Sequence, residues 1–270
     1  MNLIKRLFSK PKYYLSLCCI QKDENEYLLE WIDYHRKVGV EHFYVYDNDS
    51  KISPRITLST LIEQKIVTVI DKPGQVQQLP AYIHCLKTFG SNSRWIGFID
   101  IDEFIVPKKP HGDLRGFLKK YEDYGGVGIN WFIFGSGGQK YKNDKTQIER
   151  FLLRSKKEFG PNVHIKTIVQ PQYARSIETP HSFKYVEKKF CVNENFERIE
   201  GATFPNSTDK IQLNHYYCRS LEEYQRKIER GRSDILEKRD FSQFYAHDEG
   251  SNDIEDTLAL EILRNPVYKI

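Results

Sequence analysis

The sequence is short of features that define several classes of protein. Its apolar runs fall well below the roughly 18 residues of a membrane span, and no signal peptide precedes them. Its five cysteines are odd in number and irregularly spaced, so they indicate neither a disulfide framework nor a paired zinc motif. We therefore expect reduced thiols in a cytoplasmic protein.

No Pro-, Gly- or Ser-rich linker, low-complexity tract or internal repeat divides the 270 residues. We predict one domain at residues 13–240, with a helical extension at 241–270 that packs on it. Residues 1–12 alternate apolar side chains with Lys and Arg. This basic segment is expected to be a solvated terminus, and the alternative left open is peripheral contact with the inner face of an anionic membrane.

A dense basic stripe is also missing. The 41 Lys and Arg are nearly balanced by 37 Asp and Glu, which gives a net charge of +4. This charge suits an anionic small molecule or membrane surface, and nucleic acid ranks as the weakest partner. The sequence does not indicate an oligomeric state.

What the chain does contain is an apolar strand, residues 94–99, that ends in Asp100, Asp102 and Glu103. Crowded carboxylates repel one another unless a cation offsets them. Asp100 and Asp102 are two residues apart, so an extended backbone places them on one face, where they suit Mg²⁺ or Mn²⁺ that carries a diphosphate. Glu103 would point away and pair with a nearby Lys or Arg. The alternative is a strand that simply ends in a polar turn.

The N-terminal half alternates strand and helix patterns. Strands are predicted at 13–20, 41–46 and 66–70, and helices at 26–38, 56–64 and 77–90, with Gly39 as a helix C-cap. This order predicts an α/β fold with a mainly parallel central sheet flanked by helices. Such a sheet binds its ligand at the carboxyl ends of its strands, where the polar clusters 21–24, 47–50 and 100–102 fall.

Two later residues stand out by their surroundings. Lys166 lies inside an apolar strand, 164–169, where burial requires an anion such as phosphate; the alternative is the solvent face of an edge strand. His215 lies in a strand-like run, 212–217, and a neutral imidazole with two carboxylates forms an acceptable Mn²⁺ set. The alternative is that His215 is a core histidine with its hydrogen bonds made inside the protein. The same two interpretations apply to His181, for which the indication of a site is weaker.

The remaining candidates lie in two other segments of the second half of the chain. Trp131 and Phe134 in the strand 125–134 could stack on a sugar or belong to the core, and the glycines after them, including Gly137, would let the backbone approach a ligand. A helix at 220–230 ends in a cluster of cations, which could close over a diphosphate as a mobile flap or form a solvated face. The members of this cluster are Arg226, Lys227, Arg230 and Arg232.

Taken in order, these segments resemble the GT-A fold nucleotide-sugar glycosyltransferases, narrowly the family 92 type, which is related to family 2. The matching pieces are 18–24, 30–35, 39–50, 95–104, 130–138, 166–171, 181–183 and 213–217. One departure is Gln21-Lys22-Asp23-Glu24, where such enzymes often have Lys-Asn-Glu.

The resemblance implies a GT-A type Rossmann-like domain and a set of site residues. A metal, Mn²⁺ or Mg²⁺, would be held by Asp100, Asp102 and His215. The nucleotide sugar would contact Ile20, Lys22, Glu24, Asp47, Asn48, Gln78, Tyr82, Asp100, Ile101, Lys166, Lys227 and Arg232. The acceptor would contact Trp131, Phe134, Gly137 and His181.

The implied reaction is inverting transfer of a hexose, by family analogy galactose, from a UDP-sugar to a hydroxyl of a glycan or lipid-linked glycan in surface polysaccharide or lipopolysaccharide synthesis. Its catalytic base would be Asp234 or Glu178. Two other classes remain open on the residues alone: a metal-dependent phosphohydrolase or nuclease, and a non-catalytic nucleotide or glycan binder.

Overall fold

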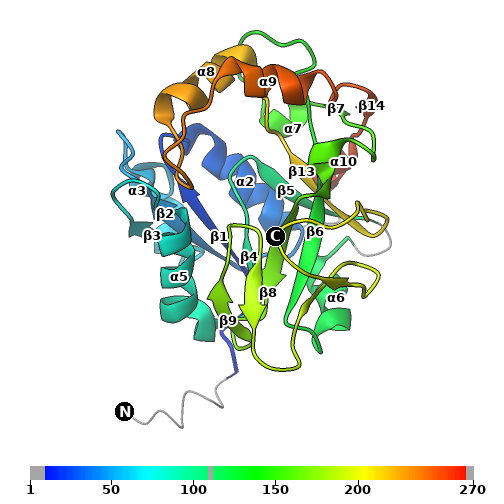
Figure 1. The fold of residues 1–270 in the computed structure, drawn as a ribbon. Coiled ribbons are helices and arrows are strands. Elements are labelled where there is room, and N and C mark those ends of the chain that lie inside the picture. Colours follow the sequence, from blue (N-terminus) through cyan, green and yellow to red (C-terminus); the bar gives the residue numbers. More distant parts are fainter. Residues whose placement is uncertain (1–9, 109–111, 266–270) are drawn as a thin grey trace.

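The computed structural model describes residues 10–108 and 112–265, which form an α/β domain around a ten-stranded sheet (Figure 1). The strands are β1 Tyr13–Gln21, β2 His42–Asp47, β3 Val67–Asp71, β4 Ser93–Phe98, β5 Glu103–Pro107, β6 Gly126–Ile133, β7 Leu153–Arg154, β8 Ile165–Val169, β9 Ala174–Ile177, β10 Phe183–Tyr185, β11 Cys191–Val192, β12 Arg198–Ile199, β13 Ile211–His215 and β14 Ile254–Glu255. The helices are α2 Asn25–Lys37, α3 Pro54–Thr57, α4 Ser59–Glu63, α5 Gln78–Phe89, α6 Leu114–Leu118, α7 Gln147–Arg150, α8 Leu221–Arg230, α9 Phe241–Asp248 and α10 Leu258–Arg264.

The N-terminal part of the sheet is parallel. β1 lies between β2 and β4, and β2 continues to β3, all in parallel pairs. Helices connect these strands, so their carboxyl ends meet at one edge, where Gln21 is in register with Asp47. The predicted α/β class with a mainly parallel sheet is confirmed. The single helix predicted at 56–64 is instead the two short helices α3 and α4, which meet at Leu58.

The C-terminal part of the sheet brings distant segments to the same edge. β8 pairs antiparallel with both β4 and β6. β13 then runs parallel to β6 and antiparallel to β5, which places His215 in register with Glu103 and Ile133. This pairing, between segments about a hundred residues apart, positions His215 beside the acids that follow β4.

The core occupies both faces of the sheet. Along β1, Leu15, Leu17 and Cys19 face one buried cluster, whereas Cys18 and Ile20 face the other, as the two-residue period of a strand requires. Burying each such leucine stabilises the fold by about 1.5–3 kcal/mol. All five cysteines are buried and none forms a disulfide, as predicted.

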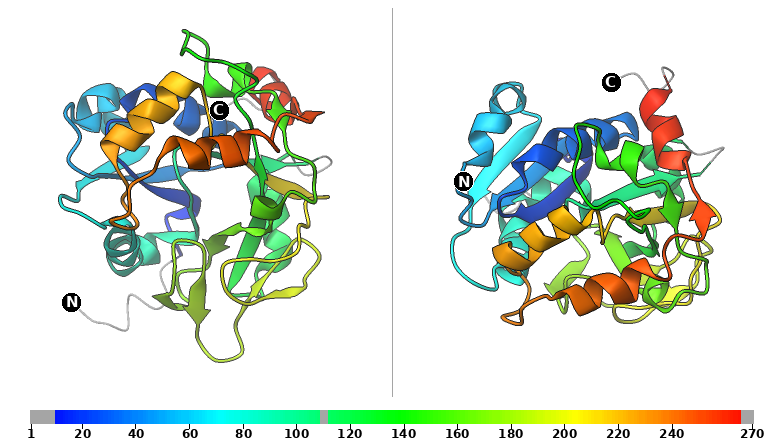
Figure 2. Two further views of the ribbon diagram at one scale, coloured as in Figure 1. Left: turned by 45° about the horizontal axis from the view of Figure 1, so that its top comes forward. Right: turned by 90° about the horizontal axis from the view of Figure 1, so that it is seen from above.

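The helices cap the sheet where its parallel strands end. Figure 2 shows α8 and α9 crossing above that edge. α9 packs on α8 through Phe244 and Tyr224, whose ring centroids lie 5.1 Å apart, and Ala259 and Ile262 of α10 join the main core. Over the described residues 241–265, α9 and α10 thus pack on α8 and on the main core. None of the helices in the described part of the chain is long and apolar enough to cross a bilayer.

His35 on α2 is fully buried and has a fixed tautomer. Its Nδ1 lies 2.8 Å from the Trp31 carbonyl and its Nε2 accepts the Ile105 N–H at 3.2 Å, so Nδ1 carries the proton. Burial lowers the pKa of His35 to about 3, whereas an unfolded histidine has a pKa near ~6.5. As the pH falls below ~6.5, protons bind the unfolded state first.

We therefore expect the free energy of unfolding to be undiminished by His35 above about pH 6.5 and to fall as the pH drops toward 3, by up to about 1.4 kcal/mol per pH unit. Urea unfolding at several pH values, on the wild type and His35→Gln, measures this. The variant should show the shallower pH dependence. Equal slopes in the two proteins would contradict the assignment.

Candidate functional site

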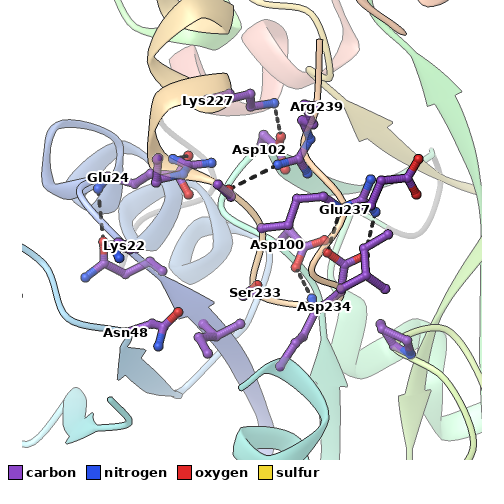
Figure 3. A pocket seen from close by; sticks show the side chains of 18 of the residues that line it. Lys22, Glu24, Asn48, Asp100, Asp102, Lys227, Ser233, Asp234, Glu237 and Arg239 are labelled. Carbon is purple, nitrogen blue, oxygen red and sulfur yellow. Dashed lines mark hydrogen bonds and ion pairs between the residues drawn. The ribbon is translucent and has the colours of Figure 1, made fainter. Parts of the chain in front are cut away.

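A cavity of about 360 Å³ opens at the carboxyl ends of β1, β2 and β4. The ends of β1 and β2 form one wall, the turn after β4 forms the floor, and the end of α8 with residues 231–239 closes the other side (Figure 3). Of the predicted site residues, the cavity is lined by Ile20, Lys22, Glu24, Asn48, Gln78, Asp100, Asp102, Trp131, Lys166, His181, His215, Lys227, Arg232 and Asp234.

Asp100 lies on the cavity floor in a polar cradle. Its Oδ2 lies 2.7 Å from the Lys166 Nζ, and its Oδ1 accepts from Gln78 Nε2 at 2.8 Å and from the Tyr82 hydroxyl at 3.4 Å. Lys166 is only 2% exposed on β8, which lies between β4 and β6, so the alternative of a solvent-facing edge position is wrong. The anion that Lys166 requires is supplied by the protein itself.

Asp102 is the buried partner of a second lysine. Its Oδ2 lies 2.5 Å from Lys227 Nζ and 3.7 Å from His215 Nε2. Burial alone would raise the pKa of Asp102, but Lys227 and His215 outweigh it and hold that pKa well below its usual range. Burial lowers the pKa of His215 in spite of Asp102. The pair is therefore an ionised carboxylate beside a neutral imidazole.

The two aspartates do not share a strand face as predicted. β4 ends at Phe98, and both residues lie in the reversal before β5, so Asp100 reaches toward β8 and Asp102 toward α8. Across residues 10–108 and 112–265, no three His, Cys, Asp or Glu side chains gather as a group that could hold a metal ion. The metal set Asp100, Asp102 and His215 stays a prediction, and in this conformation each carboxylate has a lysine partner.

Glu103 stabilises the turn that carries Asp100 and Asp102. Its wholly buried carboxylate accepts the Asp100 N–H at 2.8 Å and lies 3.4 Å from Lys166 Nζ. The predicted pairing with a lysine is found, but Glu103 points back toward Asp100 because the chain reverses there. Burial raises the pKa of Glu103 to about 8.

Three residues that were predicted to contact the nucleotide sugar lie behind the cavity surface. Asp47 accepts from Gln21 Nε2 at 3.0 Å and from the Ser50 N–H, so it shapes the loop after β2. Tyr82 is buried beneath Asp100, and Ile101 is part of the core. Each is buried by the packing that forms the site, and none lines the cavity.

On the opposite side, aromatic and imidazole rings form a wall. The Trp131 ring lies 4.5 Å from that of His215 and 5.3 Å from that of His181, measured between centroids. Phe134 is instead fully buried in the core, and the Gly137 N–H is donated to Asn252 at 2.8 Å. The positions of Phe134 and Gly137 do not support acceptor contacts, because Phe134 is buried and Gly137, although exposed, lies outside the cavity lining.

The model of glycosyltransferase family 92 matches residues 13–253. This chain belongs to that family. A family 92 protein from Ricinus communis is 25% identical over 223 residues, which cover 80% of this chain and 37% of the relative. A family 92 protein from Arabidopsis thaliana is 31% identical over 194 residues, which cover 66% of this chain and 33% of the relative. The chain thus spans about a third of the length of these curated relatives.

Membership in family 92 agrees with the GT-A type fold that the resemblance predicts. Among solved structures, a crystal structure of residues 1–349 of S. aureus TarS in complex with UDP matches with a TM-score of 0.37 and 12% identity, over 58% of this chain and 47% of that 1–349 chain. A likeness this remote carries no argument about function.

Of the two residues predicted as catalytic base in this family 92 chain, one lines the cavity and the other does not. Asp234 lines the cavity, and Arg232 binds its two oxygens at 2.9 and 2.6 Å. Burial would raise the pKa of Asp234, but Arg232 outweighs it and lowers that pKa. Glu178 lies outside the cavity lining and pairs with Lys184 at 3.2 Å.

Most of the segment that closes the cavity was not predicted from the sequence. Figure 3 shows Ser233, Asp234, Glu237 and Arg239 entering it from the chain after α8. The Ser233 carbonyl accepts the Gln78 N–H at 2.9 Å and so ties this segment to the start of α5. A signal was present, since the charged run continues beyond Arg232 to residue 239. Tyr217, Pro180 and Gln75 also line the cavity without having been predicted.

Proposed function

We propose that this family 92 chain transfers a hexose from a UDP-sugar, by family analogy UDP-galactose, to a hydroxyl of a glycan, with inversion, in surface polysaccharide or lipopolysaccharide synthesis. The observation that carries the proposal is the charge pattern of one cavity. It combines two acids on its floor with two buried lysines, Lys166 and Lys227, beside Arg230 and Arg232. This pattern suits a diphosphate.

The lysines support donor binding because a buried ammonium needs an anionic partner. Lys166 and Lys227 are 2% and 3% exposed, and carboxylates now satisfy both. Diphosphate oxygens accept charge-assisted hydrogen bonds of the same kind. At the other end of the cavity, the Asn48 amide holds the backbone of Lys72 and Gly74 at 2.8 Å each, which shapes a wall where a base and ribose would lie.

We propose Mn²⁺ or Mg²⁺ as the cofactor because the types of donor atom suit a divalent cation, although holding it would require the carboxylates to release Lys166 and Lys227. Asp102 offers an ionised carboxylate and His215 a neutral imidazole, which are acceptable ligands, and Asp100 lies on the same cavity floor. Two buried atoms nearby, Nδ1 of His215 and Oε1 of Glu103, have no hydrogen-bond partner among the described residues. Asp100, Asp102 and His215 would hold the ion, which would supply positive charge to offset that of a leaving diphosphate.

The chain's own residues would orient the acceptor and take its proton. Trp131 and Tyr217 line the cavity beside His181, and ring faces stack on sugars while leaving the hydroxyls free. Asp234 is the better placed base, since Glu178 lies off the cavity. Its carboxylate would accept the proton of the acceptor hydroxyl as that oxygen bonds to the anomeric carbon. The sugar–phosphate bond breaks in the same step, and UDP leaves with its electron pair.

Incubation of the purified protein with Mn²⁺ and a panel of UDP-, GDP- and CMP-sugars, with and without glycan acceptors, tests this proposal. We expect release of UDP from one UDP-hexose that depends on an acceptor, with the product's anomeric configuration inverted by NMR. Cleavage of unrelated phosphoesters without an acceptor would indicate a hydrolase. Binding of UDP with no turnover on any acceptor would indicate a non-catalytic binder.

A further inference from the structure

The C-terminal half of α8 is held against the cavity by the carboxylates that line it. Lys227 Nζ lies 2.5 Å from Asp102 Oδ2, and Arg230 Nη1 lies 2.9 Å from Glu24 Oε1. The start of the helix is anchored separately, through the capping box of Ser220 and Glu223. The contacts at the end of α8 are therefore the ones that a ligand in the cavity would meet.

The Lys227 amine pairs with Oδ2 of Asp102, which is also the oxygen that faces His215. Mg²⁺ binds carboxylate oxygens at about 2.0–2.1 Å, so an ammonium 2.5 Å from the same oxygen of Asp102 would lie close to such an ion and repel its charge. The Lys227 amine has a second partner, the Tyr217 carbonyl at 2.7 Å, which is not a charged group. Lys227 and an ion at this carboxylate would therefore oppose each other electrostatically.

The other lysine of the cavity is placed differently. Lys166 is fixed on the central strand β8 and bridges Asp100 and Glu103, at 2.7 and 3.4 Å. Lys227 is on α8, which ends at Arg230 and is followed by Gly231 with a φ of +83°. The segment 231–239 that lines the cavity begins there. Figure 3 shows the Lys227 amine meeting Asp102 from that side. Of the two amines, Lys227 is therefore the one carried by a helix whose next residues line the cavity, and Lys166 is the one fixed within the sheet.

We propose that Lys227 and a divalent cation compete for Asp102, and that ion binding transfers the Lys227 amine from Asp102 to the diphosphate of the donor. This inference rests on the proposed function. Without donor, the amine weakens ion binding. With donor, the phosphate oxygens give the amine a new anionic partner, so ion and donor each raise the affinity of the other by the same factor.

Mn²⁺ binding, followed by EPR of the free ion with and without UDP, tests the competition. Lys227→Met should bind Mn²⁺ alone about tenfold more tightly than the wild type, and the gain in Mn²⁺ affinity produced by UDP should shrink from about tenfold to threefold or less. The matched control is Arg226→Met on the same helix. Arg226 does not line the cavity, is 51% exposed and pairs with Glu222 at 2.6 Å. For this residue the solvated-face alternative therefore holds, and the variant should match the wild type.

Asp102→Asn separates the possible outcomes. If Asp102→Asn loses Mn²⁺ binding while Lys227→Met binds no more tightly than the wild type, the competition is overturned and the metal site stands. If the wild type and Lys227→Met both fail to bind Mn²⁺, the competition and the metal site are overturned together, while the sugar-transfer assay still decides the function. Should Lys227→Met fail to fold, Lys227→Gln, whose amide can still donate to the Tyr217 carbonyl, replaces it.

Discussion

Asp102→Asn is expected to lower kcat/KM for the UDP-sugar by about 1,000-fold, equivalent to about 4 kcal/mol of transition-state stabilisation. The Asp102 carboxylate is buried, and its Oδ2 lies 2.5 Å from Lys227 Nζ and 3.7 Å from His215 Nε2. Its negative charge therefore holds the Lys227 amine in the cavity wall. An asparagine keeps the shape but removes the charge that would hold a divalent ion and orient the amine. Initial rates of UDP release with the active donor and acceptor measure the effect.

The matched control is Asp71→Asn at the end of β3. Asp71 is 69% exposed and pairs with Arg55 at 3.0 Å outside the cavity lining, so its loss should leave kcat/KM unchanged. Thermal unfolding of Asp102→Asn checks that the variant is folded at the assay temperature. Activity of a folded Asp102→Asn within threefold of the wild type would refute the role of this carboxylate.

Arg150→Met is expected to lower the free energy of unfolding by about 3–5 kcal/mol, because it leaves a buried carboxylate without its cation. Arg150 binds both oxygens of Glu223 at 2.8 and 2.5 Å, and the two side chains are each 1% exposed. The same carboxylate accepts from the Tyr27 hydroxyl at 2.7 Å. The pair fixes the start of α8 to α7, and urea unfolding monitored by circular dichroism measures its loss.

An exposed pair provides the comparison. Arg55→Met removes the partner of Asp71 at the surface and should cost no more than about 1 kcal/mol. The double variant Arg150→Met/Glu223→Gln should recover much of the loss, since the buried charge is then removed with its partner. A loss below about 1 kcal/mol for Arg150→Met would contradict a tightly coupled buried pair.

Several features of the fold follow from local pattern. The run of apolar residues at β1, the helical spacing of α2 and Gly39, whose φ of +103° ends the turn after α2, depend on neighbours in the chain. Lys166 was also recognised as needing an anion, because an ammonium inside an apolar strand is costly whatever surrounds it. In the structure Asp100 and Glu103 satisfy this amine, and its contact with a phosphate stays a prediction.

The errors at the site arise from contacts between distant segments. Phe134 and Gly137 were predicted to face an acceptor, but Tyr216 packs against the first and Asn252 binds the second. The spacing of Asp100 and Asp102 suggested one face of a strand, although the chain reverses at both residues to start β5. Strand periodicity describes only residues that remain in a strand.

The sequence by itself determined the parallel half of the sheet, the polar ends of its strands and the acids that lie there, because apolar periodicity and the cost of unpaired charge are local properties. Only the tertiary structure decided which cation meets which carboxylate and which segment closes the cavity. Lys227 reaches Asp102 across 125 positions of the chain. Such a pairing depends on how β13 and α8 are placed by the whole sheet, and no local pattern records it.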